Sequence, residues 1–354
     1  MRLQLIDKRN TVSKKQHLII TVLSILLIIT AVVSLGLGAF YIPVGDVLQL
    51  IGEKMRLLSP TSDNALPMDV LFVVRLPRVM LGLLVGAALG VSGAAIQGIF
   101  RNPLAEPGLI GISSGASLFA VLIIAFETLL FTKLSAYLGY YLLVFGAFVG
   151  AGLTAFAVYR IAVKDGRPNV TTMLLAGIAI NGFAGALTGL MTYLATEQQL
   201  RTITFWMLGS LGGATWDNIA VVAPCIIFPV SLLLFFGKQL NAFSLGEMHA
   251  DLLGMRTDKV KLWVVILSTL AVGSSVAIAG VIGFVGLLVP HTVRLLGGAS
   301  NRYVLAGSLI LGALVLTLAD VISRTLIAPM ELPIGVITAL LGTPVFIYIL
   351  IKEK

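Results

Sequence analysis

The chain alternates between long apolar runs and short polar stretches. An apolar run of about 20 residues is the length that a helix needs to cross the hydrocarbon core of a bilayer. The third and eighth runs are short or interrupted by glycine, so we expect helices there that do not cross completely. The pattern predicts an all-α integral membrane protein, a single polytopic domain over residues 1–354, with about ten spans at residues 18–40, 78–99, 109–127, 138–160, 171–194, 217–237, 262–280, 284–296, 303–324 and 335–351.

Composition excludes a soluble protein. Hydrophobic residues make up 58% of the chain and charged residues 11%, whereas soluble domains carry about 25% charged residues. The net charge of +8 would suggest nucleic acid as the partner of a soluble chain. In a membrane protein the placement of the charges matters more, so we expect a lipid bilayer and no nucleic acid. The single Cys225 excludes an internal disulfide and a multi-cysteine metal site.

The basic residues indicate an orientation. Residues 1–17 are basic, and the run that follows is too long for the core of a signal peptide and lacks a small-residue cleavage site, so we interpret it as a retained span. With both termini in the cytoplasm, 17 of the 24 Lys and Arg residues fall on the cytoplasmic side. The positive-inside rule favours this arrangement.

Two connections are longer than the rest. We expect the outer loop, residues 41–77, to form a partly helical cap. The inner loop, residues 238–261, is too polar to span, but its apolar residues lie near helical spacing and predict a short amphipathic helix. Such a helix suits a membrane surface or a partner protein, and Glu247 and Asp251 disfavour an anionic lipid surface, so we favour a partner. The apolar residues concerned are Leu245, Met248, Leu252 and Met255.

A loose internal repeat relates residues 93–115 to residues 280–298. Each segment is a glycine-rich helix interrupted by a polar or proline-containing turn. Broken helices at corresponding places in two halves of a membrane protein are typical of a transport pathway.

Several motifs resemble one known family. They are R-L-P-R at 75–78, G-A-A-I-Q-G-I-F-R-N-P-L-A-E-P-G-L-I-G-I-S-S-G-A at 93–116, L-L-A-G-I-A-I-N at 174–181, L-G-E-M-H-A-D-L-L-G at 245–254 and G-F-V-G-L-L-V-P-H-T-V-R at 283–294. Together they resemble the FecCD-type permeases of ABC importers for iron chelates, haem and cobalamin. The resemblance implies a homodimer of ten-span subunits in a bacterial inner membrane, with two cytoplasmic ATP-binding subunits and an extracytoplasmic substrate-binding protein.

The resemblance also implies how the chain obtains energy. No phosphate-binding G-x-x-x-x-G-K-[ST] motif is present, because Gly237-Lys238 is followed by Gln239. We therefore expect no catalytic residues and no bound cofactor here, with ATP and Mg used by the partner subunit. In the family the matching inner loop docks into a groove of that subunit; the alternative is a helix that merely caps the bundle. The implied coupling residues are Leu245, Gly246, Glu247, Ala250, Leu253 and Gly254.

Three arginines are expected at the outer face. By resemblance, Arg75, Arg78 and Arg324 meet glutamates on the two lobes of the binding protein. For Arg75 and Arg78 the alternative is snorkelling at a helix start. Asp320 lies four residues before Arg324, so the two can also form a structural ion pair along one helix face.

The cytoplasmic constriction of the pathway is implied in the same way. It consists of Asn102 and Leu104 in the hinge and Thr171 and Thr172 at the start of the fifth span. Small and neutral polar groups can close without holding a charged cargo tightly. The alternative for the two threonines is ordinary helix capping.

Substrate choice depends on residues 200–216. This segment resembles the haem-type permeases, and a cation flanked by aromatic and thioether groups suits a flat ring that bears carboxylates. Siderophore and cobalamin transport are alternatives within the family, because Trp and Tyr are enriched at any membrane interface. The expected outer mouth consists of Arg201, Phe205, Trp206 and Met207.

Two alternatives are an ion-coupled secondary transporter and a haem or metal site at a histidine. An ion-coupled secondary transporter would need buried carboxylates along its path, and spans two to eight contain none near their centres. His17, His249 and His291 fall near the cytoplasmic side, so we expect no haem ligand or metal site among them. Iron, if it is carried, is carried inside a chelate.

Overall fold

The computed structural model describes residues 2–58, 65–127, 138–164 and 166–352. Over these ranges the chain is helical, apart from a hairpin of two short antiparallel strands. The elements are α1 (Arg2–Gly36), α2 (Val44–Lys54), α3 (Ala65–Asp69), the π-helical η1 (Val70–Arg75), α4 (Leu76–Phe100), the 3-10 helix η2 (Pro107–Ile110), α5 (Ile112–Phe126), α7 (Tyr140–Ala162), β1 (Val163–Lys164), β2 (Arg167–Pro168), α8 (Val170–Leu194), α9 (Glu197–Leu208), α10 (Trp216–Phe235), α11 (Gly237–Phe243), α12 (Glu247–Leu252), α13 (Thr257–Ala279), α14 (Val285–Gly297), α15 (Asn301–Thr325) and α16 (Ile334–Lys352).

The helices match the predicted spans. Within the described ranges, seven helices are long and apolar enough to cross a membrane, and three shorter apolar helices accompany them. Each of the ten predicted spans coincides with one of these helices. The expectation of short helices at the third and eighth positions is confirmed by α5 and α14.

The outer connection is more helical than predicted. α2 forms part of the expected cap, but α3, η1 and α4 continue one another, so that an apolar helical segment runs over Leu66–Phe100. Pro77 lies just after the π-helical η1 and does not interrupt the segment. The predicted start of the second span at residue 78 is therefore wrong by about a dozen residues. Residues 59–64 of the expected cap lie outside the described residues.

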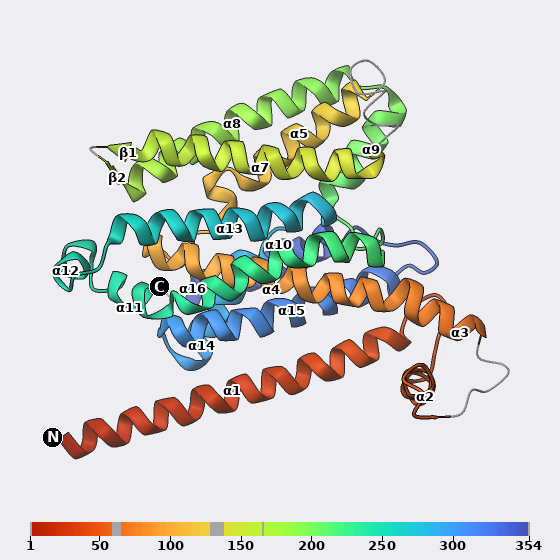
Figure 1. Cartoon of the computed structure of the whole chain (residues 1–354), viewed down its shortest axis with the longest axis horizontal. Helices are drawn as coiled ribbons and strands as arrows, with labels where there is room; N and C mark the ends of the chain where they lie inside the picture. Colours follow the sequence, from red (N-terminus) through yellow and green to blue (C-terminus); the bar gives the residue numbers. More distant parts are fainter. Residues whose placement is uncertain (1, 59–64, 128–137, 165, 353–354) are drawn as a thin grey trace.

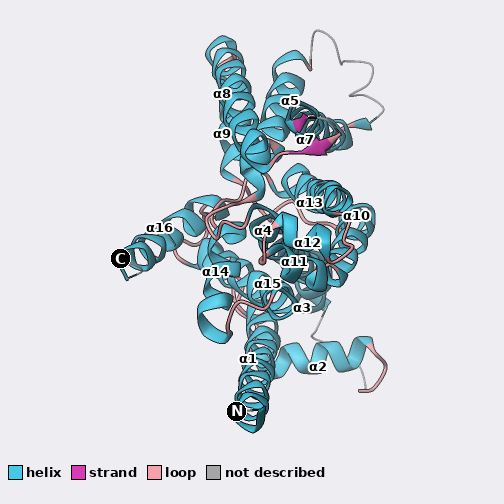
Figure 2. Ribbon diagram, turned by 90° about the vertical axis from the view of Figure 1, so that its left-hand side faces the viewer, coloured by secondary structure: helices cyan, strands magenta, loops and turns pink. Residues whose placement is uncertain are grey.

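α4 lies at the centre of the molecule. α15, α13, α14 and α10 pack around it, and α1 flanks α15. α5, α7 and α8 form a separate lobe that meets the central helices mainly through α13, as Figure 2 shows. The chain termini, α11, α12 and the hairpin lie at one end of the bundle, which we name the α12 end, while α2, α3 and α9 lie at the other, the α9 end (Figure 1).

Direct backbone contact joins α4 to its neighbours. A Cβ atom added at Gly86 would collide with the carbonyl of Gly312 on α15, and one added at Gly93 would collide with the carbonyl of Gly286 on α14. Lipid tails are as apolar as side chains, so helices in a bilayer associate through such close approaches of small residues. The glycines that would weaken a helix in water are what allow α4 to occupy the centre.

We predict that Gly86→Ala destabilises the fold whereas Gly152→Ala does not. Both glycines lie inside long helices, but a Cβ at Gly152 would meet nothing within 4 Å, so the helix-propensity gain is shared and only the collision differs. Overpacking of this kind costs about 1–3 kcal/mol. Thermal unfolding of the purified variants in one detergent measures the difference, and equal melting temperatures would contradict direct contact between α4 and α15.

Candidate functional site

An ionic cluster at the α9 end joins α4 to α15. Arg78 donates from Nε to Asp320 at 2.8 Å and from Nη1 to Glu331 at 2.7 Å. The Asp320 side chain is 3% exposed and also lies 3.3 Å from Nε of Arg324, an ion pair without hydrogen-bond geometry. The expected pair between Asp320 and Arg324 is confirmed. Glu331, in the connection between α15 and α16, is a third partner that sequence spacing could not reveal.

Two of the arginines hold the end of α1. Arg75 donates to the carbonyl oxygens of Leu35 at 2.7 Å and of Gly36 at 2.8 Å. Arg324 donates to the carbonyl oxygen of Leu37 at 2.8 Å. The last carbonyls of a helix lack partners within it, and cations near them are favourable. Arg75, Arg78 and Arg324 are all buried, so the guanidinium groups of Arg75 and Arg78 do not reach into water in the way that snorkelling requires.

The expected outer mouth lies on α9, but its four side chains diverge. Arg201 and Phe205 are exposed on the same face, with the guanidinium carbon 5.9 Å from the ring centre. Trp206 packs against the central core. Met207 instead lines a cavity between α5 and α8.

That cavity was not foreseen from the sequence. It measures about 460 Å³ and is lined by hydroxyls and glycines of α5 and α8, together with Met207 of α9. Asn181 of α8 connects the wall of this cavity to the segment after the hinge. It accepts a hydrogen bond from Ser114 and donates one to the carbonyl of Gly108 at 3.0 Å. The lining residues are Ser114, Ser117, Gly185, Thr188, Gly189, Thr192 and Met207.

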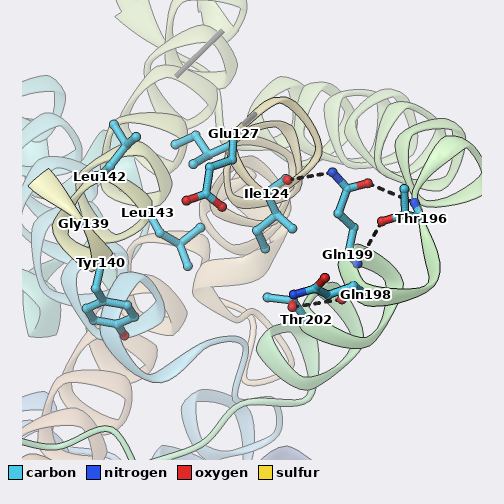
Figure 3. Close-up of a pocket in the computed structure, with 11 residues that line it drawn as sticks. Ile124, Glu127, Gly139, Tyr140, Leu142, Leu143, Thr196, Gln198, Gln199 and Thr202 are labelled. Atoms are coloured by element: carbon cyan, nitrogen blue, oxygen red, sulfur yellow. Dashed lines mark hydrogen bonds between the residues drawn. The ribbon is translucent and has the colours of Figure 1, made fainter. Parts of the chain in front are cut away.

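One side-chain amide ties α9 to the lobe, as Figure 3 shows. Gln199 accepts from the backbone N–H of Thr196 at 2.9 Å and donates to the carbonyl of Ile124 at 3.3 Å, as drawn, and to the carbonyl of Ala125 at 3.0 Å. Thr196 and Gln199 form a capping box, so one amide both starts α9 and anchors it to the end of α5. A cavity of about 540 Å³ adjoins this anchor, between α5, α7 and α9.

The four expected gate residues lie at two separate turns. Asn102 accepts a hydrogen bond from the backbone N–H of Leu104 at 2.9 Å, which leaves the Leu104 side chain exposed. At the start of α8 the cap is Asn169, whose Oδ1 accepts from the backbone N–H of Thr172 at 3.0 Å. Capping by the threonines themselves is therefore wrong. Among the described residues no hydrogen bond joins the hinge pair to Thr171 or Thr172.

The expected coupling loop folds into α11 and α12 at the α12 end. A helix that merely capped the bundle would turn its apolar side chains inward, yet Met248 is 73% exposed and Leu252 is 79% exposed. Leu245 and Leu253 are exposed as well, whereas Ala250 is buried against the bundle. α12 thus presents an apolar face outward.

Polar contacts hold α12 in place. Glu247 forms an ion pair with the buried Lys261 at 2.6 Å, and Lys261 also donates to the carbonyl of Pro168 at 2.8 Å. Thr257 donates to Asp251 at 2.7 Å, and this hydrogen bond lowers the pKa of the Asp251 carboxyl. Gly246 has a φ of 102°, a conformation that favours glycine. α12 is therefore held against the start of α13 while its apolar face stays exposed.

These features define a class of protein. The spanning helices carry these charged side chains near the two ends of the bundle, and a cavity of small polar groups lies between α5 and α8, as in a membrane permease. The model of the FecCD transport family matches residues 26–352. The chain belongs to the FecCD transport family.

The sequence is similar to individual relatives along almost its whole length. The hemin transport system permease protein HmuU of Yersinia pestis is 41% identical over 339 residues, covering 96% of both chains. The vitamin B12 import system permease protein BtuC of Citrobacter koseri is 38% identical, covering 94% of this chain and 93% of that protein. A solved structure described as an inward-facing conformation of a metal-chelate type ABC transporter has a TM-score of 0.80 and 33% identity, covering 95% of this chain and 99% of that one.

Family membership fixes the coarse function. The chain is the permease subunit of an ABC importer and a multi-pass protein of the bacterial inner membrane. ATP is hydrolysed by a separate subunit. An ion-coupled secondary transporter is thereby excluded.

We predict that Asp320→Asn destabilises the protein far more than Glu331→Gln. Removing one charge from a buried ion pair costs about 3–5 kcal/mol, because the partner charge stays buried. The Glu331 side chain is 45% exposed, and pairs in contact with water contribute only about 0.2–1 kcal/mol. Thermal unfolding in detergent tests this. Equal losses for the two amides would show that Asp320 does not anchor the cluster.

Proposed function

We propose that this permease imports haem, delivered by a substrate-binding protein, through alternating access powered by the ATP-binding subunits. The observation that carries the proposal is the 41% identity to HmuU over almost the whole chain. The exposed pair of Arg201 and Phe205 supports it, since a guanidinium beside an aromatic ring suits a flat apolar ring that carries carboxylates.

Within this proposal the α12 end faces the cytoplasm. The exposed apolar face of α12, together with Leu245, Gly246, Glu247, Ala250, Leu253 and Gly254, docks into the groove of the ATP-binding subunit. The basic residues at this end support the orientation under the positive-inside rule. The polar contacts of Glu247 and Lys261 would carry the partner's movement into α13.

Docking of the binding protein is assigned to the α9 end. The positive charge there comes from Arg75, Arg78 and Arg324. Because these side chains are buried, they act mainly through the electrostatic potential at the surface. A carboxylate of the binding protein can also take the place of the exposed Glu331. In a homodimer the cluster occurs twice, which matches a bilobed binding protein.

The translocation path is assigned to the cavity between α5 and α8. Its hydroxyls and glycines are the small neutral groups that release a large chelate. Asn102 and Leu104, together with Thr171 and Thr172, close the path at the cytoplasmic side, and a second copy of the chain supplies the opposite wall.

The direct test is ligand-stimulated ATPase activity of the complex in proteoliposomes, with binding protein present. Haem, a ferric siderophore and cobalamin are compared at equal concentrations. The proposal expects stimulation by haem. Stimulation by cobalamin alone would contradict haem import and indicate a cobalamin permease, like the relative BtuC.

We predict that Met248→Ser and Leu252→Ser each weaken binding of the ATP-binding subunit about tenfold without changing the melting temperature. Both side chains are more than 70% exposed, so they contribute to an interface and not to the core. Leu57→Ser, a 73% exposed position outside α12, is the matched control. Unchanged affinity of both α12 variants would remove this helix from the interface.

We predict that Arg201→Gln reduces haem uptake several-fold and that Arg201→Lys restores only part of it. Lysine keeps the charge but not the forked geometry that pairs with a carboxylate. Uptake of iron-labelled haem into proteoliposomes gives the rate, and pull-down of the partner subunits checks assembly. Parental uptake by Arg201→Gln would exclude Arg201 from the pathway.

A further inference from the structure

A basic pocket opens at the α12 end beside the coupling helix. It measures about 320 Å³ and lies where the ends of α4 and α14, the start of α15 and the turn after α11 meet. Figure 2, which looks onto this end, places α4, α11 and α12 near its centre. Its polar lining consists of Gln97, Arg101, Asn102, Ser244, Arg294 and Asn301.

Two guanidinium groups line the pocket without a carboxylate. Arg294 donates from Nη1 to the amide oxygen of Asn301 at 3.2 Å. Neither Arg101 nor Arg294 forms an ion pair with any described residue. By contrast, the buried Lys261 of the same end is fully paired. Two cations in one pocket repel each other, so the pocket favours an anion.

The backbone of Arg101 is held in an unusual conformation. Arg101 ends α4 with a φ of 49°, in the left-handed region that favours glycine or asparagine. A non-glycine residue held there is strained and points to a function of its side chain. The side chain reaches α12, since a carbon added at Gly246 would lie 3.7 Å from Nη1 of Arg101.

A buried amide side chain also borders the pocket. Gln97 is 2% exposed and donates to the carbonyl of Leu287 at 3.1 Å. Its own oxygen is buried and has no donor among the described residues. The pocket therefore offers two cationic donors beside neutral polar groups. The carboxylate of an acidic side chain satisfies the two guanidinium groups through charge-assisted hydrogen bonds.

We propose that this pocket receives an acidic side chain of the ATP-binding subunit and locks that subunit beside α12. The inference rests on the proposed function, and the pocket is continuous with the exposed face of α12 through Gly246. A protein partner fits better than a lipid headgroup, because α4 and α11, which lead into the pocket lining, lie near the centre of this end (Figure 2). The apolar face of α12 then supplies contact area, and the pocket supplies charge and orientation.

The test measures the affinity of the permease in nanodiscs for the purified ATP-binding subunit over a salt series. Arg101→Gln and Arg294→Gln should each raise the Kd about tenfold, because a charge-assisted hydrogen bond is lost. The double variant should also reduce the dependence of the Kd on salt. Arg302→Gln is the matched control, since Arg302 is exposed one residue from Asn301 but does not line the pocket.

Two further arms keep the result unambiguous. Arg294→Lys should retain intermediate affinity, which separates loss of charge from loss of fold, and the melting temperature of each variant is recorded. Arg294→Glu should lose binding. An acidic-to-arginine substitution in the groove of the ATP-binding subunit should restore it, and failure of every such substitution would overturn the pocket assignment.

The outcomes separate this inference from the proposed function. If Leu252→Ser weakens binding while Arg101→Gln and Arg294→Gln do not, the pocket proposal fails and coupling through α12 stands. If none of the three variants weakens binding, both fail. If the double variant loses bound phosphatidylglycerol in native mass spectrometry but keeps its affinity for the subunit, the pocket is a lipid site and the proposal is overturned.

Discussion

The direct packing of backbone on backbone between α4 and its neighbours is the constraint on which the rest of the structure depends. Gly86 faces the backbone of Gly312 on α15, and Gly93 faces Gly286 on α14, with no side chain between them. Such contacts cannot be adjusted by a change of rotamer, because no rotamer is involved. We therefore expect the central helices to move as one rigid unit, whereas the lobe of α5, α7 and α8 meets this unit mainly through α13.

α4 carries arginine side chains to both ends of the bundle. At the α9 end Arg75 and Arg78, at the start of the helix, form buried hydrogen bonds to α1 and α15, and Arg78 also pairs with the half-exposed Glu331 of the connection to α16. At the α12 end α4 terminates in Arg101, beside the coupling helix. A single rigid helix thus links the surface proposed for the binding protein to the surface proposed for the ATP-binding subunit.

Apolar run length was enough to predict the ten helices, because in a bilayer the helix is the solution that satisfies every backbone group. Sequence spacing could also pair Asp320 with Arg324, which are one helical turn apart. It could not find Glu331 at Arg78, the cap at Asn169 or the cavity around Ser114, since these contacts join segments far apart in the chain. Burial of the three arginines was missed for the same reason: Arg75 and Arg324 donate to backbone carbonyls of α1, which any sequence possesses, and Arg78 donates to carboxylates more than 240 residues away.

The rigidity of the α4–α15 unit can be measured directly with pairs of spin labels. One label at Val73, beside the start of α4, is combined with a second label either at Thr325, the end of α15, or at Tyr193 near the end of α8; all three positions are exposed. Double electron–electron resonance then compares the assembled transporter with and without ATP. The account predicts an unchanged distance between Val73 and Thr325 and a shifted distance between Val73 and Tyr193. An equal shift in both pairs would contradict a rigid central unit.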